Sequence, residues 1–217
     1  MPRRESGGTV TTQTLRIRRI WDRYAPRYDR DMRLVERVLF TGGREWVCGR
    51  ARGDVLEVAV GTGLNLPFYP PDVALTGLDL SPGMLAVART RAAELGRAVA
   101  LREGDAQALP FPGASFDTVV CTLGLCGVPD ERVAIAEMYR VLRPGGQLLL
   151  LDHVAAPNRV LRAGQRLLER ITVPLLADHL TRRPRPLLPR AGFSVDRGER
   201  SRAGMVERVR AVRPIAS

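Results

Sequence analysis

The chain has 217 residues, with 34 arginines, no lysine and 23 acidic residues, which gives a formal net charge of +11. Its length suits one α/β domain, and no stretch is apolar over the ~18–20 residues that a membrane-spanning helix needs. Three cysteines without metal-ligand spacing exclude a cysteine-based metal centre. We therefore predict no metal site, reduced thiols and a cytoplasmic location.

The N-terminal part predicts a polar tail followed by helices. Residues 1–13 are polar and predict a disordered segment. Over 15–28, apolar residues recur at three- and four-residue steps beside a stripe of arginines, which is typical of an amphipathic helix. Pro26 should break this helix, because proline removes a backbone donor. A second helix is expected over 32–50, with an interruption at the Gly42-Gly43 pair.

Strands and helices alternate through the rest of the chain. Strands are predicted at Asp54–Val60, Ala74–Asp79, Ala98–Glu103, Thr118–Leu123, Gln147–His153, Phe193–Asp196 and Val206–Val212. Helices are predicted after Leu64 and over Pro82–Leu95, Asp130–Leu142 and Val160–Leu176. This alternation predicts an α/β fold, a doubly wound, Rossmann-like and mostly parallel sheet with helices on both faces. A ligand is then expected at the carboxyl ends of the strands.

A glycine turn follows the first predicted strand. Residues 55–63 form an apolar run that ends in Gly61 and Gly63, and the next such run ends on Asp79. Glycines here let the backbone approach a ligand, and an acidic residue at the next strand tip accepts ribose hydroxyls. Leu66 takes the position of a third glycine, so the dinucleotide fingerprint is incomplete. The sequence therefore predicts a nucleoside-containing cofactor other than a dinucleotide.

A set of motifs, in the expected order, resembles one family. They are Glu57-x-Ala59-x-Gly61-x-Gly63, Gly77–Ser81, Gly104–Ala106 and Leu142–Gly146, and the resemblance spans about 21–196. Together they resemble the class I S-adenosylmethionine (SAM) methyltransferases, most of all the ubiquinone/menaquinone-biosynthesis and phosphatidylethanolamine methyltransferases. The resemblance implies a seven-stranded sheet, N-terminal lid helices, and SAM as cofactor with S-adenosylhomocysteine as product. Ala59 stands where the family usually has glycine, which predicts a slightly altered turn.

The resemblance also implies cofactor-binding roles. Gly61 and Gly63 would approach the methionyl part of SAM, with Glu57 near its ammonium group. Asp79 would accept the ribose hydroxyls, and Asp105 the adenine amino group. The full predicted set is Tyr28, Glu57, Ala59, Gly61, Gly63, Asn65, Asp79, Leu80, Met84, Asp105, Ala106 and Thr122. The alternative for each carboxylate is an ordinary solvated or structural acid, and for Asn65 a helix cap.

Candidate catalytic residues are expected near the same strand ends. His153 ends a predicted strand, where an imidazole is placed to remove a proton from an acceptor, and a structural histidine is the alternative. His179 lies in a His-Leu-Thr-Arg stretch similar to one in membrane-associated alkyl-thiol methyltransferases, with a purely structural role as its alternative. Tyr28, together with Tyr24, resembles the aromatic lid that covers SAM in the subgroup, and core packing is the competing role.

Basic charge lies outside the predicted cofactor-binding core. Residues 1–30 hold eight arginines and three acids, and 158–217 hold fourteen and five, whereas 31–157 are slightly acidic. This favours an anionic substrate or surface, or else reflects an arginine-rich composition. We predict a small-molecule or lipid-like acceptor, methylated at O, N or S. A phosphatidylethanolamine-type N-methyltransferase, in peripheral contact with the inner membrane surface through its arginine-rich N-terminal segment, is the open alternative.

The predicted organisation is a single domain over 14–217. Lid helices occupy 14–50, the cofactor-binding core 51–157, and the acceptor-site cap with edge strands 158–217. Nucleic acid is not an expected partner, because the chain lacks an Asn-Pro-Pro-Tyr type tetrad and has few aromatic residues to stack bases. An RNA methyltransferase and a non-catalytic scaffold are lesser alternatives. The sequence leaves the oligomeric state open.

Overall fold

The computed structural model describes residues 11–215. Residues 1–10 of the predicted tail lie outside the described residues. Helix α1 (Thr12–Leu39) begins directly afterwards, and the Thr11 side chain caps it by accepting the backbone N–H of Thr14 at 3.1 Å. The predicted tail is therefore wrong at residues 12 and 13, because this cap starts a helix there.

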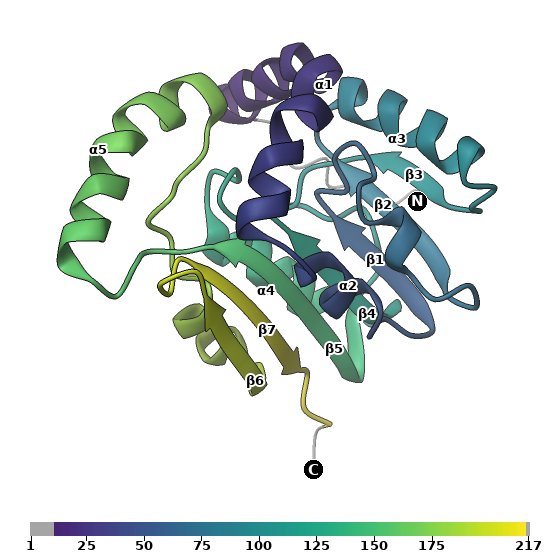
Figure 1. Cartoon of the computed structure of the whole chain (residues 1–217). Helices are drawn as coiled ribbons and strands as arrows, with labels where there is room; N and C mark the ends of the chain where they lie inside the picture. Colours follow the sequence, from purple (N-terminus) through teal and green to yellow (C-terminus); the bar gives the residue numbers. More distant parts are fainter. Residues whose placement is uncertain (1–10, 216–217) are drawn as a thin grey trace.

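Seven strands form one sheet in the order β3-β2-β1-β4-β5-β7-β6 (Figure 1). Their bounds are β1 Asp54–Val58, β2 Ala74–Asp79, β3 Ala100–Glu103, β4 Phe116–Thr122, β5 Leu142–His153, β6 Ser194–Ser201 and β7 Val206–Val212. Strands β1 to β5 pair in parallel, whereas β7 is antiparallel to both β5 and β6. The predicted fold class is confirmed.

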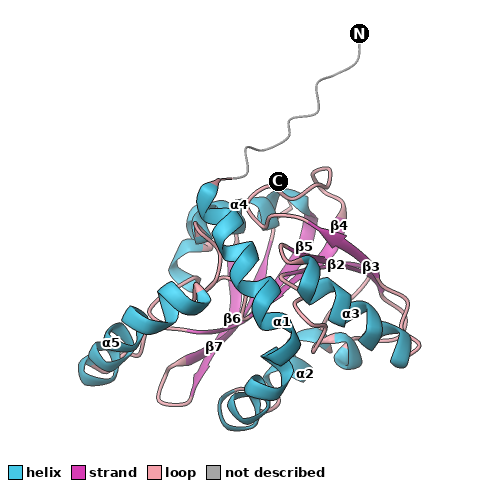
Figure 2. Ribbon diagram, turned by 90° about the horizontal axis from the view of Figure 1, so that it is seen from above, coloured by secondary structure: helices cyan, strands magenta, loops and turns pink. Residues whose placement is uncertain are grey.

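Helices cover both faces of this sheet (Figures 1 and 2). After α1 the chain forms α2 (Gly43–Cys48), α3 (Pro82–Glu94), α4 (Glu131–Val141) and α5 (Arg159–Leu176), with 3-10 turns η1 (Leu66–Phe68), η2 (Arg185–Leu187) and η3 (Pro189–Ala191). The helix predicted after Leu64 is wrong beyond η1, because Pro67, Pro70 and Pro71 remove backbone donors. Among the described residues, no helix combines the length and apolarity that crossing a membrane requires.

Helix α1 continues through Pro26, so the predicted break is wrong. Figure 1 shows α1 crossing above the sheet and then descending toward α2, as expected of a helix that bends at a proline. Contacts hold the helix on both sides of the proline: Asp22 binds the start of α3, and Asp29 binds Thr62 and Arg91. These contacts offset the local cost of a helical proline, which is about 3 kcal/mol.

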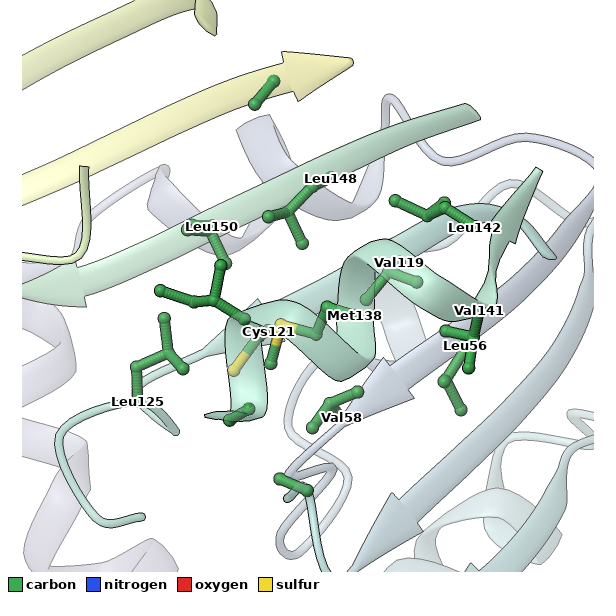
Figure 3. Packing of buried hydrophobic residues seen from close by; sticks show 14 of the residues in the cluster. Leu56, Val58, Val119, Cys121, Leu125, Met138, Val141, Leu142, Leu148 and Leu150 are labelled. Carbon is green, nitrogen blue, oxygen red and sulfur yellow. The ribbon is translucent and has the colours of Figure 1, made fainter. Parts of the chain in front are cut away.

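Alternate residues of β5 contribute to two separate cores. Leu148 and Leu150 pack with Met138 of α4 on one face of the sheet (Figure 3). Leu149 and Leu151 belong to a second cluster, which includes Trp46 of α2. A parallel strand that is covered on both faces is apolar at successive positions, as β5 is here. This packing fixes the strand tips at which the candidate site is built.

Candidate cofactor-binding site

A cavity lies at the carboxyl ends of β1, β2 and β4, and α1 covers it with Ile17, Trp21 and Tyr28. The predicted cofactor residues that line it are Tyr28, Ala59, Gly61, Asp79, Leu80, Met84, Asp105, Ala106 and Thr122. Segments far apart in the sequence thus meet where a doubly wound sheet binds its ligands. Glu57, Gly63 and Asn65, also predicted, do not belong to this lining.

The turn after β1 has the backbone conformation that glycine favours. The φ angle is +58° at Ala59, +56° at Gly61 and +79° at Gly63. The N–H of Val60 donates to the carbonyl of Leu78 at 3.0 Å, which ties the turn to the end of β2. A left-handed conformation costs an alanine about 1–2 kcal/mol that glycine avoids. Ala59 is therefore accommodated in a glycine-like turn at a cost in strain.

Asp79 occupies the tip of β2 and lines the cavity. Its Oδ2 accepts the backbone N–H of Gly61 at 2.8 Å, and its Oδ1 accepts that of Ser81 at 2.8 Å. Each carboxylate oxygen keeps a lone pair after these bonds, so each can still accept a hydroxyl. Burial raises the pKa of Asp79 to about 6, although the two N–H groups oppose this shift.

Next to this aspartate the cavity wall combines apolar side chains with a second carboxylate. Leu80 and Met84 line it at the start of α3, which Ser81 caps by accepting the N–H of Met84 at 3.1 Å. Asp105 and Ala106 line it from the loop after β3. An apolar wall that carries a hydrogen-bond acceptor suits a nucleobase with an amino group.

A buried polar cluster adjoins the glycine turn. Glu57 accepts hydrogen bonds from Asn65 Nδ2 at 2.7 Å and from the Tyr69 hydroxyl at 2.9 Å. Asn65 Nδ2 also donates to Thr122 Oγ1 at 2.8 Å, and Thr122 reaches the cavity. Burial raises the pKa of Glu57 to about 7, against the effect of its two hydrogen bonds. Glu57 and Asn65 therefore support the turn from within the protein instead of lining the cavity.

Arg44 joins this polar cluster to the cavity, and no local sequence pattern indicated it. Its Nη1 donates to Asn65 Oδ1 at 2.7 Å and to Thr122 Oγ1 at 3.1 Å. Its Nε and Nη2 bind the carboxylate of Glu36, and its side chain is only 9% exposed. The one available signal was an arginine directly after the Gly42-Gly43 pair. Glu36, Asn65 and Thr122 together engage four of its five N–H groups, which leaves one Nη2 N–H to meet an acceptor in the cavity.

An aromatic cluster of α1 covers the cavity, with Trp21 and Tyr28 in the cavity lining. The rings of Trp21, Tyr24 and Tyr28 pack with centroids 5.8 to 6.1 Å apart. Burial raises the pKa of the Tyr28 hydroxyl, so this group stays protonated near neutral pH and can donate a hydrogen bond. The apolar side chains Ile17 and Trp21 face the cavity. This placement fits the lid that the family resemblance implies.

Charged side chains on α1 fasten this lid to the core. The fastening pairs are Arg18–Glu103 at 2.9 Å, Asp22–Ser81 at 2.6 Å and Asp29–Arg91 at 2.5 Å. Asp22 Oδ1 also accepts the backbone N–H of Gly83 at 2.9 Å, at the positive end of the α3 dipole. The lid is thus held by contacts that border the cavity and leave its interior free.

The two histidines do not belong to the lining of the cavity. His153 Nε2 lies 3.0 Å from Asp178 Oδ1, with Cys126 and Asp152 beside it. Burial lowers the pKa of His153, but the close Asp178 carboxylate and the charge of Asp152 outweigh this effect and raise the pKa to about 9. His179 donates its backbone N–H to the carbonyl of Cys126 at 3.1 Å and lines a separate surface hollow. The structure therefore places both histidines against the loop after β4 and away from the cavity wall.

Residues 56–150 match the family model of a methyltransferase domain. A phosphatidylethanolamine N-methyltransferase from Cereibacter sphaeroides is 44% identical to this chain, over 54% of the chain and 59% of the relative. A demethylmenaquinone methyltransferase from Deinococcus radiodurans is 41% identical, over 59% of the chain and 56% of the relative. The chain thus spans a little more than half the length of these curated relatives.

Solved structures share the fold. The YcgJ protein from Bacillus subtilis superposes with a TM-score of 0.65 at 20% identity, covering 81% of this chain and 98% of that protein. The [4+2]-cyclase SpnF gives a TM-score of 0.66 at 20% identity, covering 82% of this chain and 80% of the cyclase. Because one neighbour is a cyclase, the fold alone does not fix the chemistry. The comparisons confirm the fold and the family resemblance found in the sequence.

Proposed function

We propose a function from the premise that this chain carries the methyltransferase domain of the SAM-dependent methyltransferases, as its family match and its fold indicate. The function is transfer of a methyl group from SAM to O, N or S of a small or amphipathic molecule. The observation that carries this proposal is the presence of Asp79 and Arg44 in one cavity. SAM contains both groups that these residues would bind, a ribose and a carboxylate.

The ribose, the adenine and the carboxylate of SAM each have a group of matching chemistry in this cavity. Asp79 would accept hydrogen bonds from the two ribose hydroxyls, and Asp105 would accept one from the adenine amino group. Arg44 would bind the carboxylate through its remaining Nη2 N–H, since its other donors are held by Glu36, Asn65 and Thr122. Glu57 would contribute indirectly, because it holds the glycine turn through Asn65.

The acceptor would meet a largely apolar wall. When bound, SAM supplies a methyl group that its sulfonium centre has already activated. The chain then has to align the acceptor and exclude water. Trp21, Leu123 and Val128 line the cavity and are suited to both tasks. This wall favours an acceptor with an apolar portion, such as a quinol, a lipid or an alkyl thiol.

An acceptor that carries a proton must lose it during methyl transfer, and the candidate catalytic residues would assist this step. With a pKa of about 9, His153 is an imidazolium at neutral pH, which stabilises developing negative charge and accepts a proton only in its minor neutral form. Asp178 would orient this ring. Tyr28 would donate a hydrogen bond to the acceptor from within the cavity. Neither histidine lines the cavity, so Tyr28 is the strongest of the three candidates, and His179 is the weakest because it lines a different hollow.

A second candidate function is N-methylation of a phospholipid head group at a membrane surface. The relative from Cereibacter sphaeroides is named for that reaction. The excess of arginines in residues 1–30 and 158–217 would favour an anionic membrane surface. On this proposal the chain would act in the cytoplasm, peripherally at the inner surface of the membrane.

Calorimetry with SAM and S-adenosylhomocysteine tests the cofactor, and labelled SAM with a panel of acceptors tests the reaction. The panel contains a demethylated quinol, an aminophospholipid in vesicles and an alkyl thiol. We expect both nucleosides to bind and label to appear on one acceptor class. Asp79→Ala should weaken the binding of both nucleosides by about 1–3 kcal/mol. If the wild-type chain does not bind SAM, the proposal is wrong.

A further inference from the structure

Helix α5 contacts the rest of the chain through its polar side. Gln165 accepts the backbone N–H of Ala156 at 2.8 Å and donates to the carbonyl of Val154 at 3.0 Å. Glu169 accepts a backbone N–H at 2.8 Å and Thr172 donates to a carbonyl at 2.8 Å, both in the loop after α5. These three side chains are four and three residues apart, so they share one face of the helix.

The apolar side of α5 is turned to solvent, which reverses the usual arrangement. No residue of the helix is buried. Six of its large apolar residues are 41–79% exposed, namely Val160, Leu161, Leu167, Leu168, Ile171 and Leu175. Figure 2 shows α5 projecting at one edge of the molecule, apart from the sheet. An exposed apolar face of this extent marks an interaction site, unlike single apolar residues scattered over a surface.

A row of arginines borders this apolar face. Its members recur at steps of three and four residues and line a shallow surface hollow; they are Arg159, Arg162, Arg166 and Arg170. The single acid of the helix, Glu169, is already engaged by Thr181. The arginine row therefore presents uncompensated positive charge along the apolar face.

We propose that α5 docks this chain onto an anionic lipid bilayer, with the apolar face in the acyl boundary and the arginine row against lipid phosphates. An apolar helix face with an arginine-rich border is the composition of helices that lie in the membrane interface. Anionic lipid attracts each arginine near the surface. A second copy of the chain is a poorer occupant, because two chains of formal charge +11 repel each other.

Docking through α5 would bring the bilayer beside the lid. The C-terminal end of α5 contacts the start of α1, where Arg16 Nη2 donates to the carbonyl of Pro174 at 3.2 Å. The next turn of α1 carries Ile17 and Trp21, which cover the cavity. An amphipathic acceptor would then reach the cavity directly from the lipid. That last step rests on the proposed function, whereas the docking does not.

Co-sedimentation of the full chain with vesicles tests the docking, with no cofactor or acceptor present. We expect binding to vesicles of phosphatidylglycerol and phosphatidylcholine, weak binding to phosphatidylcholine alone, and weaker binding at high salt, since salt screens the arginines. The double variants Leu167→Asp/Ile171→Asp and Arg166→Glu/Arg170→Glu should each lower binding at least ~tenfold. The first removes the apolar contact, and the second reverses charge while leaving that contact in place.

Matched controls place the same chemical changes elsewhere on the surface. Leu95→Asp/Val133→Asp alters two other exposed apolar residues, and Arg89→Glu/Arg190→Glu makes the same charge change on other exposed arginines. Both should bind vesicles as the wild type does. Circular dichroism melting verifies that every variant is folded, so loss of binding is not mistaken for loss of structure.

Two results would overturn the docking. One is a wild-type chain that stays in the supernatant with anionic vesicles, and the other is vesicle binding by the α5 variants that equals the controls. If light scattering instead found a dimer that only Leu167→Asp/Ile171→Asp dissociates, the face would belong to a second copy. None of these measurements uses methyl transfer, so failure of the docking leaves the proposed function untouched.

Discussion

A β-carbon placed on Gly124 would lie 2.7 Å from the Cβ of Ala59 and 2.8 Å from the Sγ of Cys121. Glycine at position 124 therefore makes room for the alanine that stands in the glycine turn. Both residues line the cavity, so the pair couples the turn after β1 to the loop after β4.

We predict that Gly124→Ala lowers the free energy of unfolding by about 1–3 kcal/mol through overpacking. In an Ala59→Gly background the same substitution should cost about 1 kcal/mol less, because one of the two clashes has been removed. Urea unfolding of the four proteins in this cycle measures the coupling. Equal costs in the two backgrounds would show that the residues are independent.

Arg44→Met should weaken SAM binding by about 1.5–3 kcal/mol, since the cofactor carboxylate loses a charged partner. The nucleoside 5′-methylthioadenosine lacks the amino-acid part, so its affinity should be the same in the variant and the wild type. Calorimetry with both ligands distinguishes the two effects. Arg97→Met is the control, because it removes a half-buried arginine outside the cavity lining. Loss of affinity for both ligands would mean that Arg44 supports the fold instead.

Cofactor affinity should depend on the ionisation of Asp79. Ribose hydroxyls donate to the carboxylate form, and burial raises the pKa of Asp79 to about 6. Affinity for 5′-methylthioadenosine should therefore be constant above about pH 7 and fall roughly tenfold per pH unit well below pH 6. Asp79→Asn should bind weakly at every pH, with this component of the profile removed. A profile that is unchanged in the variant would contradict the ribose role.

The His153–Asp178 pair should make folding stability depend on pH. A histidine whose pKa rises from its ordinary 6.5 to about 9 on folding stabilises the folded state below pH 6.5, and this contribution is lost as pH rises through 9. We expect the free energy of unfolding to fall by on the order of 2–3 kcal/mol over that range.

Urea titrations from about pH 6 to pH 9.5 measure this slope. Asp178→Asn should flatten it, because the substitution removes the negative charge that lies 3.0 Å from His153 and raises its pKa. His179→Gln should leave it intact, since burial lowers the pKa of that histidine instead. Glu57 and the buried thiols of Cys48 and Cys121 also titrate differently in the folded and unfolded states over this range, but they are common to all three proteins, so the difference between the slopes reports the pair. Equal slopes in all three proteins would rule out the pair as their source.

Local patterns predicted the parts of the site that adjoin single strands or helix starts. Asp79 was predicted from an apolar run that ends in an acidic residue. Ser81 and Pro82 were predicted as the cap and first residue of a helix. Such signals lie within a few residues, so one sequence is enough to find them.

Features that depend on distant partners were not predictable in this way. Arg44 meets Thr122 across 78 positions, and no periodicity relates the two. Pro26 was expected to end a helix, yet the contacts of Asp22 and Asp29 with the core keep α1 continuous. In both cases tertiary contacts outweigh the local preference, and these contacts are visible only in the folded chain.

Because α1 changes direction near Pro26, its two parts lie on two sides of the candidate cofactor cavity. The part before Pro26 carries Trp21 over the cavity, and the part after it carries Tyr28 in the cavity wall and Glu36, which binds Arg44. Movement of α1 would widen this space on both sides at once, so a slow movement of the helix would delay the release of a bound product. A straightened helix at this corner would shorten the residence time of the nucleoside before it altered any reacting group.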